Sequence, residues 1–503
     1  MFDRNRHALT IFGSAVGSGV LGHLLVHGAD AGLNVALVLL TLLVANAAVE
    51  RLNADTQSRS GAPDGWLLVA LGFAACFAWR DAEFLLVLDM LAIAAALGLR
   101  AVSQLRPARE GRVRDSVGAA LSTALSFVGT PCVLLAELKD SPFVRDRALG
   151  RAGPVLFGLL LALPLVIFFG SLFASADPAF NEIASAFVRW NFDDLFEYVF
   201  VSGVLSVLTA GFLGAWHLKS RDPFAAFTPT AVVASPSAVS IGIAIGAMVL
   251  VFLVFVAIQL RYFFGGEQLV QSVAGLSYAE YARRGFFEMV VASTFALPVL
   301  YAADVGVGNA GAKALQSIRA LGAVQLVLMA VVMVSATSRM VLYVRVYGLT
   351  EDRMLASAIL LWLALTMLWF AVTVLRGRHE RFTFGAIVSA FTVLAALNIA
   401  NPHQWIASVN TARAAAGGKP VDGGYLSQLS ADAALFLAVH LKELPAAVQC
   451  AVGNRLLADA VHYETEHDWR DWNYARSNAV AVVRPLKLIR LECAGSADTV
   501  RAN

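Results

Sequence analysis

Long, nearly uncharged apolar runs dominate this sequence. Of its 503 residues, 58% are hydrophobic and only 15% are charged, and the mean hydropathy is +0.69. The runs hold about 16–24 residues, and a helix of that length crosses a hydrocarbon core of about 30 Å. Only helices or closed barrels satisfy every backbone group in lipid, and runs without period-two alternation favour helices. The predicted fold class is therefore all-α, a polytopic membrane bundle with a small helical, soluble C-terminal region.

The apolar runs predict about eleven spans, near 9–27, 33–50, 65–79, 83–99, 153–174, 196–217, 238–260, 285–303, 315–337, 354–375 and 382–400. Residues 116–138 lie between arginine-rich ends and form either a twelfth span or a helix in the interface. Along the chain we expect an N-terminal four-span region (1–100), a basic cytoplasmic loop with an interfacial helix (101–152), a seven-span core (153–400) and a soluble helical tail (401–503).

After Ala400 the sequence becomes polar, and residues 401–503 show helical patterns at 429–445 and 447–463. One apolar face recurs every three or four residues, as a packed helix requires. It consists of Leu426, Leu429, Ala433, Leu437 and Leu441.

The distribution of Lys and Arg predicts the orientation. With a cytoplasmic N-terminus and 116–138 not spanning, positive charges on the short loops divide roughly 20 inside to 8 outside, as the positive-inside rule requires. The predicted localisation is the bacterial inner (cytoplasmic) membrane, multi-pass, with an extracytoplasmic tail. Four arginines then lie on the outer side, against the rule: Arg283, Arg284, Arg339 and Arg345.

Cysteines and net charge limit the cofactors and partners. Cys76 and Cys132 lie in apolar stretches and are expected to pack there. Cys450 and Cys493 lie in the tail and can pair if it is outside, in an oxidising compartment. A net charge of +2 gives no general attraction to nucleic acid. We expect membrane lipids as partners, with another envelope protein as a possible partner of 401–503, and no cofactor, no metal and no catalytic residue.

Asp89 is the first candidate ion or proton site, because it lies within Leu-Leu-Val-Leu-Asp-Met-Leu-Ala-Ile. A carboxylate near the middle of the bilayer is costly, so it must be protonated or face a partner inside the bundle. Two alternatives are a single structural, hydrogen-bonded acid and a shifted span that leaves Asp89 near its end.

The stretch Tyr278–Glu288 places charges beside a predicted span. On a helix, Arg284 is four residues from both Glu280 and Glu288, and such pairs share a face. Glu288 already enters the membrane and is the second candidate ion or proton site. Glu280, Arg283 and Arg284 form a candidate charge network or an anion-binding site, since guanidinium groups bind oxyanions in bidentate fashion. The alternative is that the tyrosines and arginines are interfacial anchors.

Two short segments are expected to interrupt helices. Gly265-Gly266 is expected to break the span that begins near 238. Asp177-Pro178 is expected to end the span at 153–174, because a residue before proline disfavours the helical region. Asp177 and Asn181 then belong to a candidate acidic outer rim, which either attracts cations or is simply solvated.

The ordered landmarks of this chain resemble a bacterial membrane-protein family catalogued as domain of unknown function 4173. They are Gly32-Leu-Asn-Val, Ser175-Ala-Asp-Pro-Ala-Phe, Tyr278-Ala-Glu-Tyr-Ala-Arg-Arg-Gly-Phe-Phe-Glu, Tyr347-Gly-Leu-Thr-Glu-Asp-Arg, Asn401-Pro with Ile406-Ala and Asn410, Tyr425-Leu-x-x-Leu-Ser-x-Asp-Ala433, and Asp468-Trp-Arg-Asp-Trp-Asn. His403 stands where that family has an acidic residue. The resemblance implies a polytopic inner-membrane protein and brings no established reaction or substrate.

Three functions remain open from the sequence. The first is transport or ion-coupled conduction, with Asp89 and Glu288 as sites and Arg284 as counter-charge. The second is an enzyme or flippase that acts on lipid-linked envelope precursors, with Arg283 and Arg284 holding phosphate. The third is a membrane scaffold or sensor whose tail binds another envelope protein.

Overall fold

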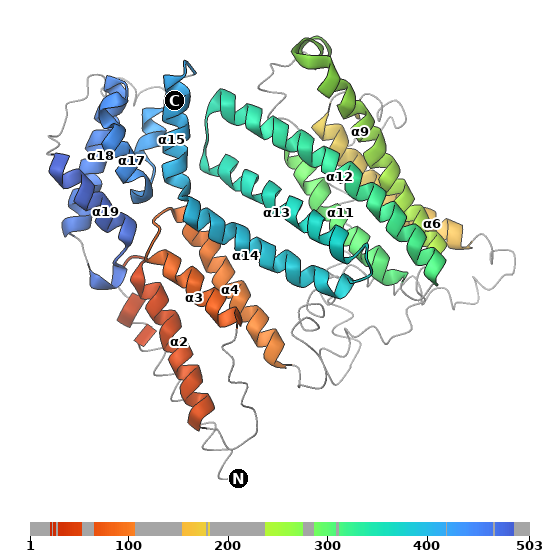
Figure 1. Ribbon diagram of the computed structural model, residues 1–503, viewed down its shortest axis with the longest axis horizontal. Coiled ribbons are helices and arrows are strands. Elements are labelled where there is room, and N and C mark those ends of the chain that lie inside the picture. The colour runs from red at the N-terminus through yellow and green to blue at the C-terminus, as the bar shows by residue number, and fades with distance from the viewer. Residues whose placement is uncertain are drawn as a thin grey trace. The chain divides into compact units, whose positions relative to one another are not determined.

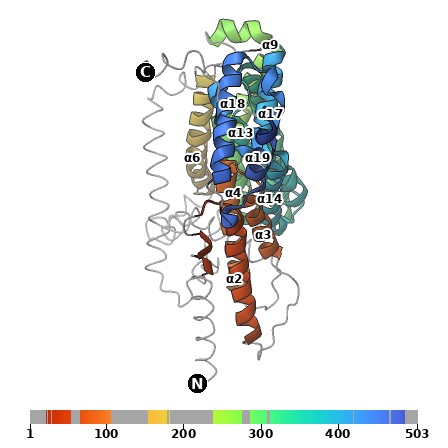
Figure 2. The same ribbon diagram turned by 90° about the vertical axis from the view of Figure 1, so that its left-hand side faces the viewer.

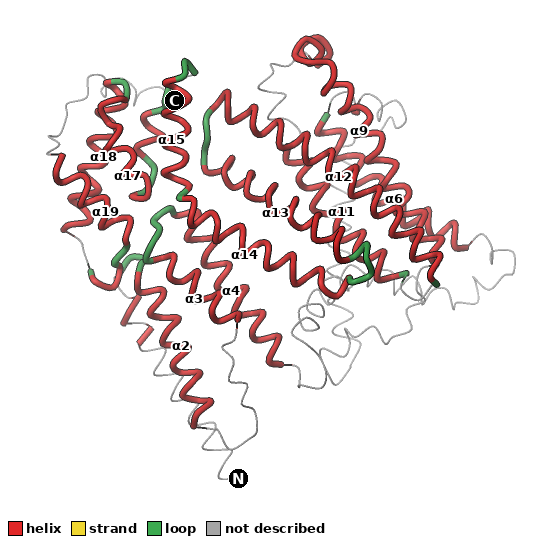
Figure 3. Tube along the Cα trace, viewed as in Figure 1, coloured by secondary structure: helices red, strands yellow, loops and turns green. Residues whose placement is uncertain are grey.

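A computed structural model describes residues 21–22, 24–26, 29–52, 65–105, 153–177, 180–181, 237–274, 286–307, 311–418, 420–465 and 468–486. Over these residues the secondary structure is helical, with loops between helices and no strand (Figure 3). The described helices up to residue 400 are α2 (Leu33–Leu52), α3 (Gly65–Phe77), α4 (Glu83–Leu105), α6 (Gly153–Ala176), α9 (Ala238–Ala274), α11 (Phe286–Gly306), α12 (Ala312–Tyr347), α13 (Glu351–Thr373), a short 3-10 turn η5 (His379–Arg381) and α14 (Phe382–Ala400).

Several of these helices are long and apolar enough to cross a membrane. Within the described residues there are five such segments: Ala238–Ile258, Phe286–Gly306, Ala312–Tyr347, Glu351–Thr373 and His379–Ala400. The all-α membrane class is therefore confirmed. The count of eleven spans stays a prediction, because 116–138, 196–217 and most of 9–27 lie outside the described residues.

The two predicted helix breaks have different outcomes. The prediction at Gly265-Gly266 is wrong, because α9 continues through both glycines to Ala274. A glycine inside a helix costs only about 1 kcal/mol relative to alanine, which a helix of 37 residues tolerates. The prediction at Asp177 is confirmed, since α6 ends at Ala176 immediately before the Asp-Pro pair.

The chain divides into two compact units, each assembled from distant segments. The first unit contains Met1–Leu105, Arg345–Ala358 and Phe391–Asn503, and the second contains Arg106–Val344 and Ile359–Ala390. Helices α13 and α14 each carry residues of both units. The four regions predicted along the chain follow sequence order and stay a prediction.

In the first unit, α2, α3 and α4 pack around an apolar cluster. Its buried members are Leu39, Ala70, Phe73, Ala74, Phe77, Ala92, Ile93 and Ala96. Phe391 of α14 adds an aromatic ring, with its centroid 5.8 Å from that of Phe73 and 6.1 Å from that of Trp66. Helices α4 and α14, which carry polar residues such as Asp89 and Asn398, both contribute side chains to this apolar cluster.

The C-terminal tail of the first unit is a set of short helices. They are α15 (Pro402–Ala415), α16 (Gly423–Ser427), η6 (Ala431–Ala433), α17 (Ala434–His440), η7 (Leu441–Glu443), α18 (Ala446–Thr465), η8 (Trp469–Asp471), α19 (Tyr474–Val483) and η9 (Arg484–Leu486). Figures 1 and 2 show α17, α18 and α19 packed together.

The helical patterns predicted for the tail are found in part. The pattern at 447–463 is α18, and the five apolar residues from Leu426 to Leu441 are all buried, so the packed face is confirmed. The pattern at 429–445 is not one helix. Ser430 caps the 3-10 turn η6 with its side chain, and the last turn of the segment ends before Pro445.

In the second unit, α6 and α9 pack closely against each other. Phe173 on α6 stacks on Phe255 of α9 with centroids 4.0 Å apart, and Phe252 meets Phe173 edge-on at 4.9 Å. Gly158 allows this approach, because a Cβ there would lie 2.9 Å from both the Cβ of Ile243 and the Cα of Ser240. Small residues serve this purpose at helix contacts within membranes.

Replacing Gly158 with alanine should therefore push α6 away from α9. We expect a destabilisation of about 1–3 kcal/mol, typical of overpacking. The measurement is the thermal unfolding midpoint of the purified protein in detergent. Gly170→Ala is the matched control on the same helix, because nothing lies within 4 Å of a Cβ at Gly170. Equal midpoints for the two variants would show that the α6–α9 contact tolerates a methyl group.

Candidate functional site

Asp89 lies on α4 with its side chain fully buried. Its Oδ1 accepts a hydrogen bond of 2.8 Å from Nδ2 of Asn398 on α14, and the same Nδ2 also bonds the carbonyl of Leu394 at 3.2 Å. Two acceptor atoms face no donor within the described part of the chain, Oδ2 of Asp89 and Oδ1 of Asn398. The structure thus joins two residues that lie 309 positions apart.

When Asp89 is ionised, the Asp89–Asn398 pair has no positive charge to balance the carboxylate. The amide of Asn398 is neutral, and no cationic side chain among the described residues bonds the carboxylate. Burying a charge without a partner is costly, and a carboxyl proton removes that cost while supplying one O–H donor. The geometry therefore suits binding of a proton or of a small cation at Asp89.

A second buried group, Arg80, lies in the loop between α3 and α4. Its Nε donates to the carbonyl of Asn398 at 2.6 Å, and its Nη1 forms an ion pair of 3.2 Å with Oδ1 of Asp432. The guanidinium carbon lies 4.2 Å from the ring centroid of Trp79. Arg80 and Asp432 are 7% and 5% exposed. Each charge is therefore neutralised by the other away from water.

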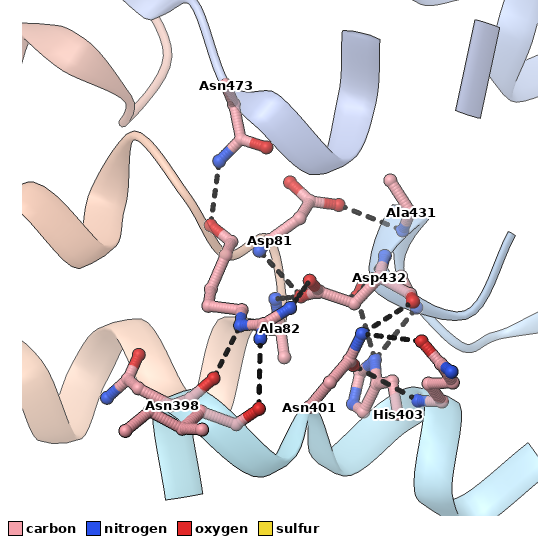
Figure 4. Close-up of polar contacts among 12 residues, drawn as sticks. Asp81, Ala82, Asn398, Asn401, His403, Ala431, Asp432 and Asn473 are labelled. Carbon is pink, nitrogen blue, oxygen red and sulfur yellow. Dashed lines mark hydrogen bonds and ion pairs between the residues drawn. The ribbon is translucent and has the colours of Figure 1, made fainter. Parts of the chain in front are cut away.

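Asp432 binds Arg80 and also the backbone just before α4 (Figure 4). Its Oδ2 accepts hydrogen bonds from the backbone N–H groups of Asp81 and Ala82, at 2.7 and 2.9 Å. Asp81 and Ala82 are the two residues immediately before α4, and buried backbone N–H groups need an acceptor. One tail side chain thus holds the backbone that leads into α4 and pairs with a loop arginine.

Asp81 extends the junction towards α19. Its Oδ1 accepts from Nε of Arg476 at 2.7 Å, and its Oδ2 accepts from the backbone N–H of Ala431 at 3.1 Å. Burial raises the pKa of Asp81, and the guanidinium of Arg476 opposes that shift. Asn473, labelled in Figure 4, completes the contact. It donates to the carbonyls of Phe77 and Arg80, at 2.9 and 2.7 Å.

His403 connects α15 to the start of α13. The backbone N–H of Ser430 donates to Nδ1 of His403 at 2.9 Å, which makes Nδ1 an acceptor. The ring proton then lies on Nε2, which is 2.8 Å from Oε1 of Glu351. Asn401, two residues earlier, caps α15 in the left-handed region at φ 52°.

We call the contacts among Arg80, Asp81, Asp432, Asn473 and Arg476 the polar junction.

A family model described as Domain of unknown function (DUF4153) matches residues 67–438. The chain belongs to the DUF4153 family. The resemblance to family 4173 is therefore wrong. The resemblance rests on short motifs spread along the chain, from Gly32 to the tail, whereas the family model matches one continuous segment. No curated protein and no solved structure matches the chain.

The DUF4153 match covers only part of the candidate site. Arg80, Asp89, Asn398 and Asp432 lie inside residues 67–438, whereas Asn473 and Arg476 lie beyond them. Asp89 and the Arg80–Asp432 ion pair thus lie in the segment that the family model matches. The hydrogen bonds made by Asn473 and Arg476 come from residues beyond it.

The other predicted site residues lie in the second unit. Glu288 is in the first turn of α11 and is half-buried. Glu280, Arg283 and Arg284 lie outside the described residues. The Arg284–Glu288 pair and the anion-binding site therefore stay predictions.

Asp177 occupies a different setting from the outer rim that its sequence suggests. Its side chain is fully buried, with Oδ2 lying 3.9 Å from Nη2 of Arg339 on α12. Asn181 is exposed, and its backbone N–H donates to the carbonyl of Asp177 at 3.0 Å. The burial of Asp177 also gives Arg339 an anionic neighbour inside the bundle.

Sequence reasoning missed the central residues of the polar junction. Arg80 and Asp81 stand between two apolar runs, which reads as an ordinary loop, and Asp432 was only part of a landmark. It also missed a pair in the second unit, where Nε of Arg319 lies 2.8 Å from Oδ1 of the buried Asp304. For Arg80 and Asp81 the signal in the sequence was a pair of charges between two predicted spans, whereas Asp432 lies in the predicted tail and Arg319 within the predicted span 315–337.

Replacing Asp432 with alanine should destabilise the protein strongly. It leaves Arg80 buried without its ion-pair partner and removes the acceptor of two N–H groups, which predicts a loss of about 3–5 kcal/mol. The measurement is thermal unfolding followed by tryptophan fluorescence. Arg455→Ala is the control, because Arg455 and Asp459 form an exposed ion pair in the same tail, worth at most about 1 kcal/mol. Similar midpoints for both variants would contradict a structural role of the polar junction.

Proposed function

We propose that this DUF4153-family protein transports or conducts a proton or small cation across the membrane, with Asp89 as the group that binds it. The observation that carries the proposal is the complete burial of Asp89 with one neutral hydrogen-bond partner. Ionisable residues inside membrane helices are costly to keep, and they mark ion paths and proton relays more often than structural contacts.

The surroundings of Asp89 support a group that changes its charge state. Buried structural carboxylates are usually paired with a cation, as Asp432 is with Arg80. Asp89 has only the amide of Asn398, which can donate to one carboxyl oxygen and accept from the other when that oxygen carries a proton. A proton or a small cation on Asp89 completes the pair without a further protein group.

Access to Asp89 requires a second conformation. Its side chain has no exposed surface, so a proton or cation reaches it only when α4 and α14 separate near Asn398. Transport proteins alternate between such states, and the bound ligand shifts the balance between them. Glu288, half-buried at the start of α11, is the proposed second carboxylate of the path.

Asp89→Asn should abolish pH-dependent flux. The purified protein is reconstituted in vesicles with a pH-sensitive dye inside, and flux is driven by a potassium diffusion potential. Asparagine keeps the size and the hydrogen bonding of the side chain but cannot take up a proton. Glu288→Gln should reduce flux in the same assay.

The matched control for this assay is Glu83→Gln, because Glu83 is an exposed carboxylate in the first turn of the same helix. It should leave flux unchanged. Wild-type flux from Asp89→Asn would sink the assignment of Asp89.

We further propose about eleven spans in a bacterial inner membrane, with a cytoplasmic N-terminus and an extracytoplasmic tail. The tail carries a cysteine, Cys450, that takes part in a disulfide bond, and disulfides persist mainly in oxidising compartments. The pairing of Cys450 with Cys493 stays a prediction, because Cys493 lies outside the described residues.

An extracytoplasmic tail predicts that Cys450 resists alkylation until it is reduced. The test is labelling with a maleimide–polyethylene glycol in denaturant, with and without prior reduction, on protein from intact cells. Cys493→Ser should make Cys450 reactive without reduction, whereas Cys132→Ser should not. Cys76, which carries a free thiol, reports that labelling works. A Cys450 that reacts fully without reduction in the wild-type chain would contradict an oxidised tail.

A scaffold or sensor is the second candidate function, and the polar junction favours it. The junction fixes α19 and η6 to the loop after α3 through buried charges, so the tail presents one defined surface. Deleting 401–503 would leave Arg80 unpaired, and the full chain is therefore the proper bait. An Asp89→Asn protein that lacks flux but still performs its cellular role would favour this candidate over transport. The enzyme or flippase alternative rests on Arg283 and Arg284, outside the described residues.

A further inference from the structure

A cleft of about 480 Å³ opens beside the polar junction. Its walls come from the loop after α3, the end of α14, α15, η6 and α19, all within the first unit. A volume of this size suits a small molecule. The residues that give the cleft its character are Trp79, Asn401, Gln404, Trp405, Tyr474 and Asn478.

The cleft has little free charge to offer. Arg80 and Asp432 are part of its lining, but they are almost fully buried and paired with each other at 3.2 Å. An anionic ligand would need a free cation, and a cationic ligand would need a free carboxylate. The electrostatics therefore favour a neutral ligand.

Neutral hydrogen-bonding groups line the opening. Oε1 of Gln404 accepts from Asn401 at 3.1 Å, and Asn401 also donates to the carbonyl of Asp432. That arrangement fixes the amide of Gln404 and leaves its two N–H donors without a partner in the described part of the chain. Asn478 on α19 also lines the cleft.

Aromatic rings provide the remaining surface. Trp405 and Tyr474 are 49% and 52% exposed and belong to different helices, α15 and α19. Trp79 is 38% exposed, and Arg80 covers one of its faces. Large aromatic rings left exposed beside fixed amides are costly unless something covers them.

We propose that this cleft binds a neutral, hydroxyl-rich ligand of one or two sugar rings. A pyranose has an apolar C–H face that packs on an aromatic ring and equatorial hydroxyls that pair with planar amides. The same chemistry is offered by a soluble saccharide and by the sugar headgroup of a lipid. The lipid form is a natural candidate because Ile399 and Ala400, the last residues of a candidate membrane span, line the cleft. The site is independent of ion binding at Asp89.

The test uses the full-length protein in phospholipid nanodiscs. In one arm, N-acetylglucosamine and its β-1,4-linked disaccharide are added, and binding is followed by saturation-transfer difference NMR. In the second arm, the nanodiscs carry a neutral glucosyl diacylglycerol or the same diacylglycerol without sugar, and tryptophan fluorescence is compared. Binding in the first arm identifies a soluble saccharide, and binding in the second alone identifies a lipid headgroup.

Trp405→Ala and Gln404→Ala should each weaken binding about tenfold, the loss expected when a central contact is truncated. Trp469→Ala is the matched control, because Trp469 is a 63% exposed tryptophan of the same tail that does not line the cleft. It should bind like the wild type. Equal binding by the Trp405 variant and the wild type would overturn the proposal. So would quenching of Trp405 by brominated acyl chains with no sugar binding, which would make the aromatic residues interfacial anchors.

Discussion

The first unit depends on one buried ion pair, Arg80 with Asp432. A buried pair is not in itself strongly stabilising, because both charges lose their hydration, but removing either partner leaves the other stranded. Here Asp432 also accepts the N–H groups of Asp81 and Ala82, just before α4, and Arg80 also donates to the carbonyl of Asn398 at the end of α14. The pair therefore fixes the tail, the loop after α3 and the end of a membrane helix in one arrangement.

The helical class and the positions of several helices, but little of the site, could be predicted from the sequence. The ends of α14 and α3 agree with the predicted spans to within two residues, because the change from apolar to polar residues is a property of the local sequence. The pairing of Asp89 with Asn398 is not local, since the two residues are separated by 309 positions. Each was visible only as a polar residue in an apolar run. Asp177 shows the same limit: its position after α6 was predicted from Pro178, but its burial against Arg339 depends on how helices pack.

In the structure, several residues of the landmark motifs form hydrogen bonds to the backbone. Asn401 caps α15 and bonds the carbonyl of Asp432, while Asn410 bonds both the N–H and the carbonyl of Leu349. The hydroxyl of Tyr425 accepts from the N–H of Glu351. Asn401 begins a helix, and Asn410 and Tyr425 satisfy backbone groups between α12 and the start of α13. The roles of these three residues are structural.

Asn398 is the residue through which the two halves of the site meet. Its side chain donates to Asp89, and its backbone carbonyl accepts from Arg80, which is paired with Asp432. If α4 and α14 separate to admit a proton or cation to Asp89, the carbonyl of Asn398 must either carry Arg80 with it or release it. Release would leave Arg80 paired with Asp432 alone, because the other carbonyl that it contacts, that of Ile399 at 3.4 Å, lies on the same helix. Because buried N–H donors without an acceptor are costly, the coupled movement is favoured. The state of Asp89 and the position of the tail should then change together, which links ion binding in the membrane to the surface that carries the cleft.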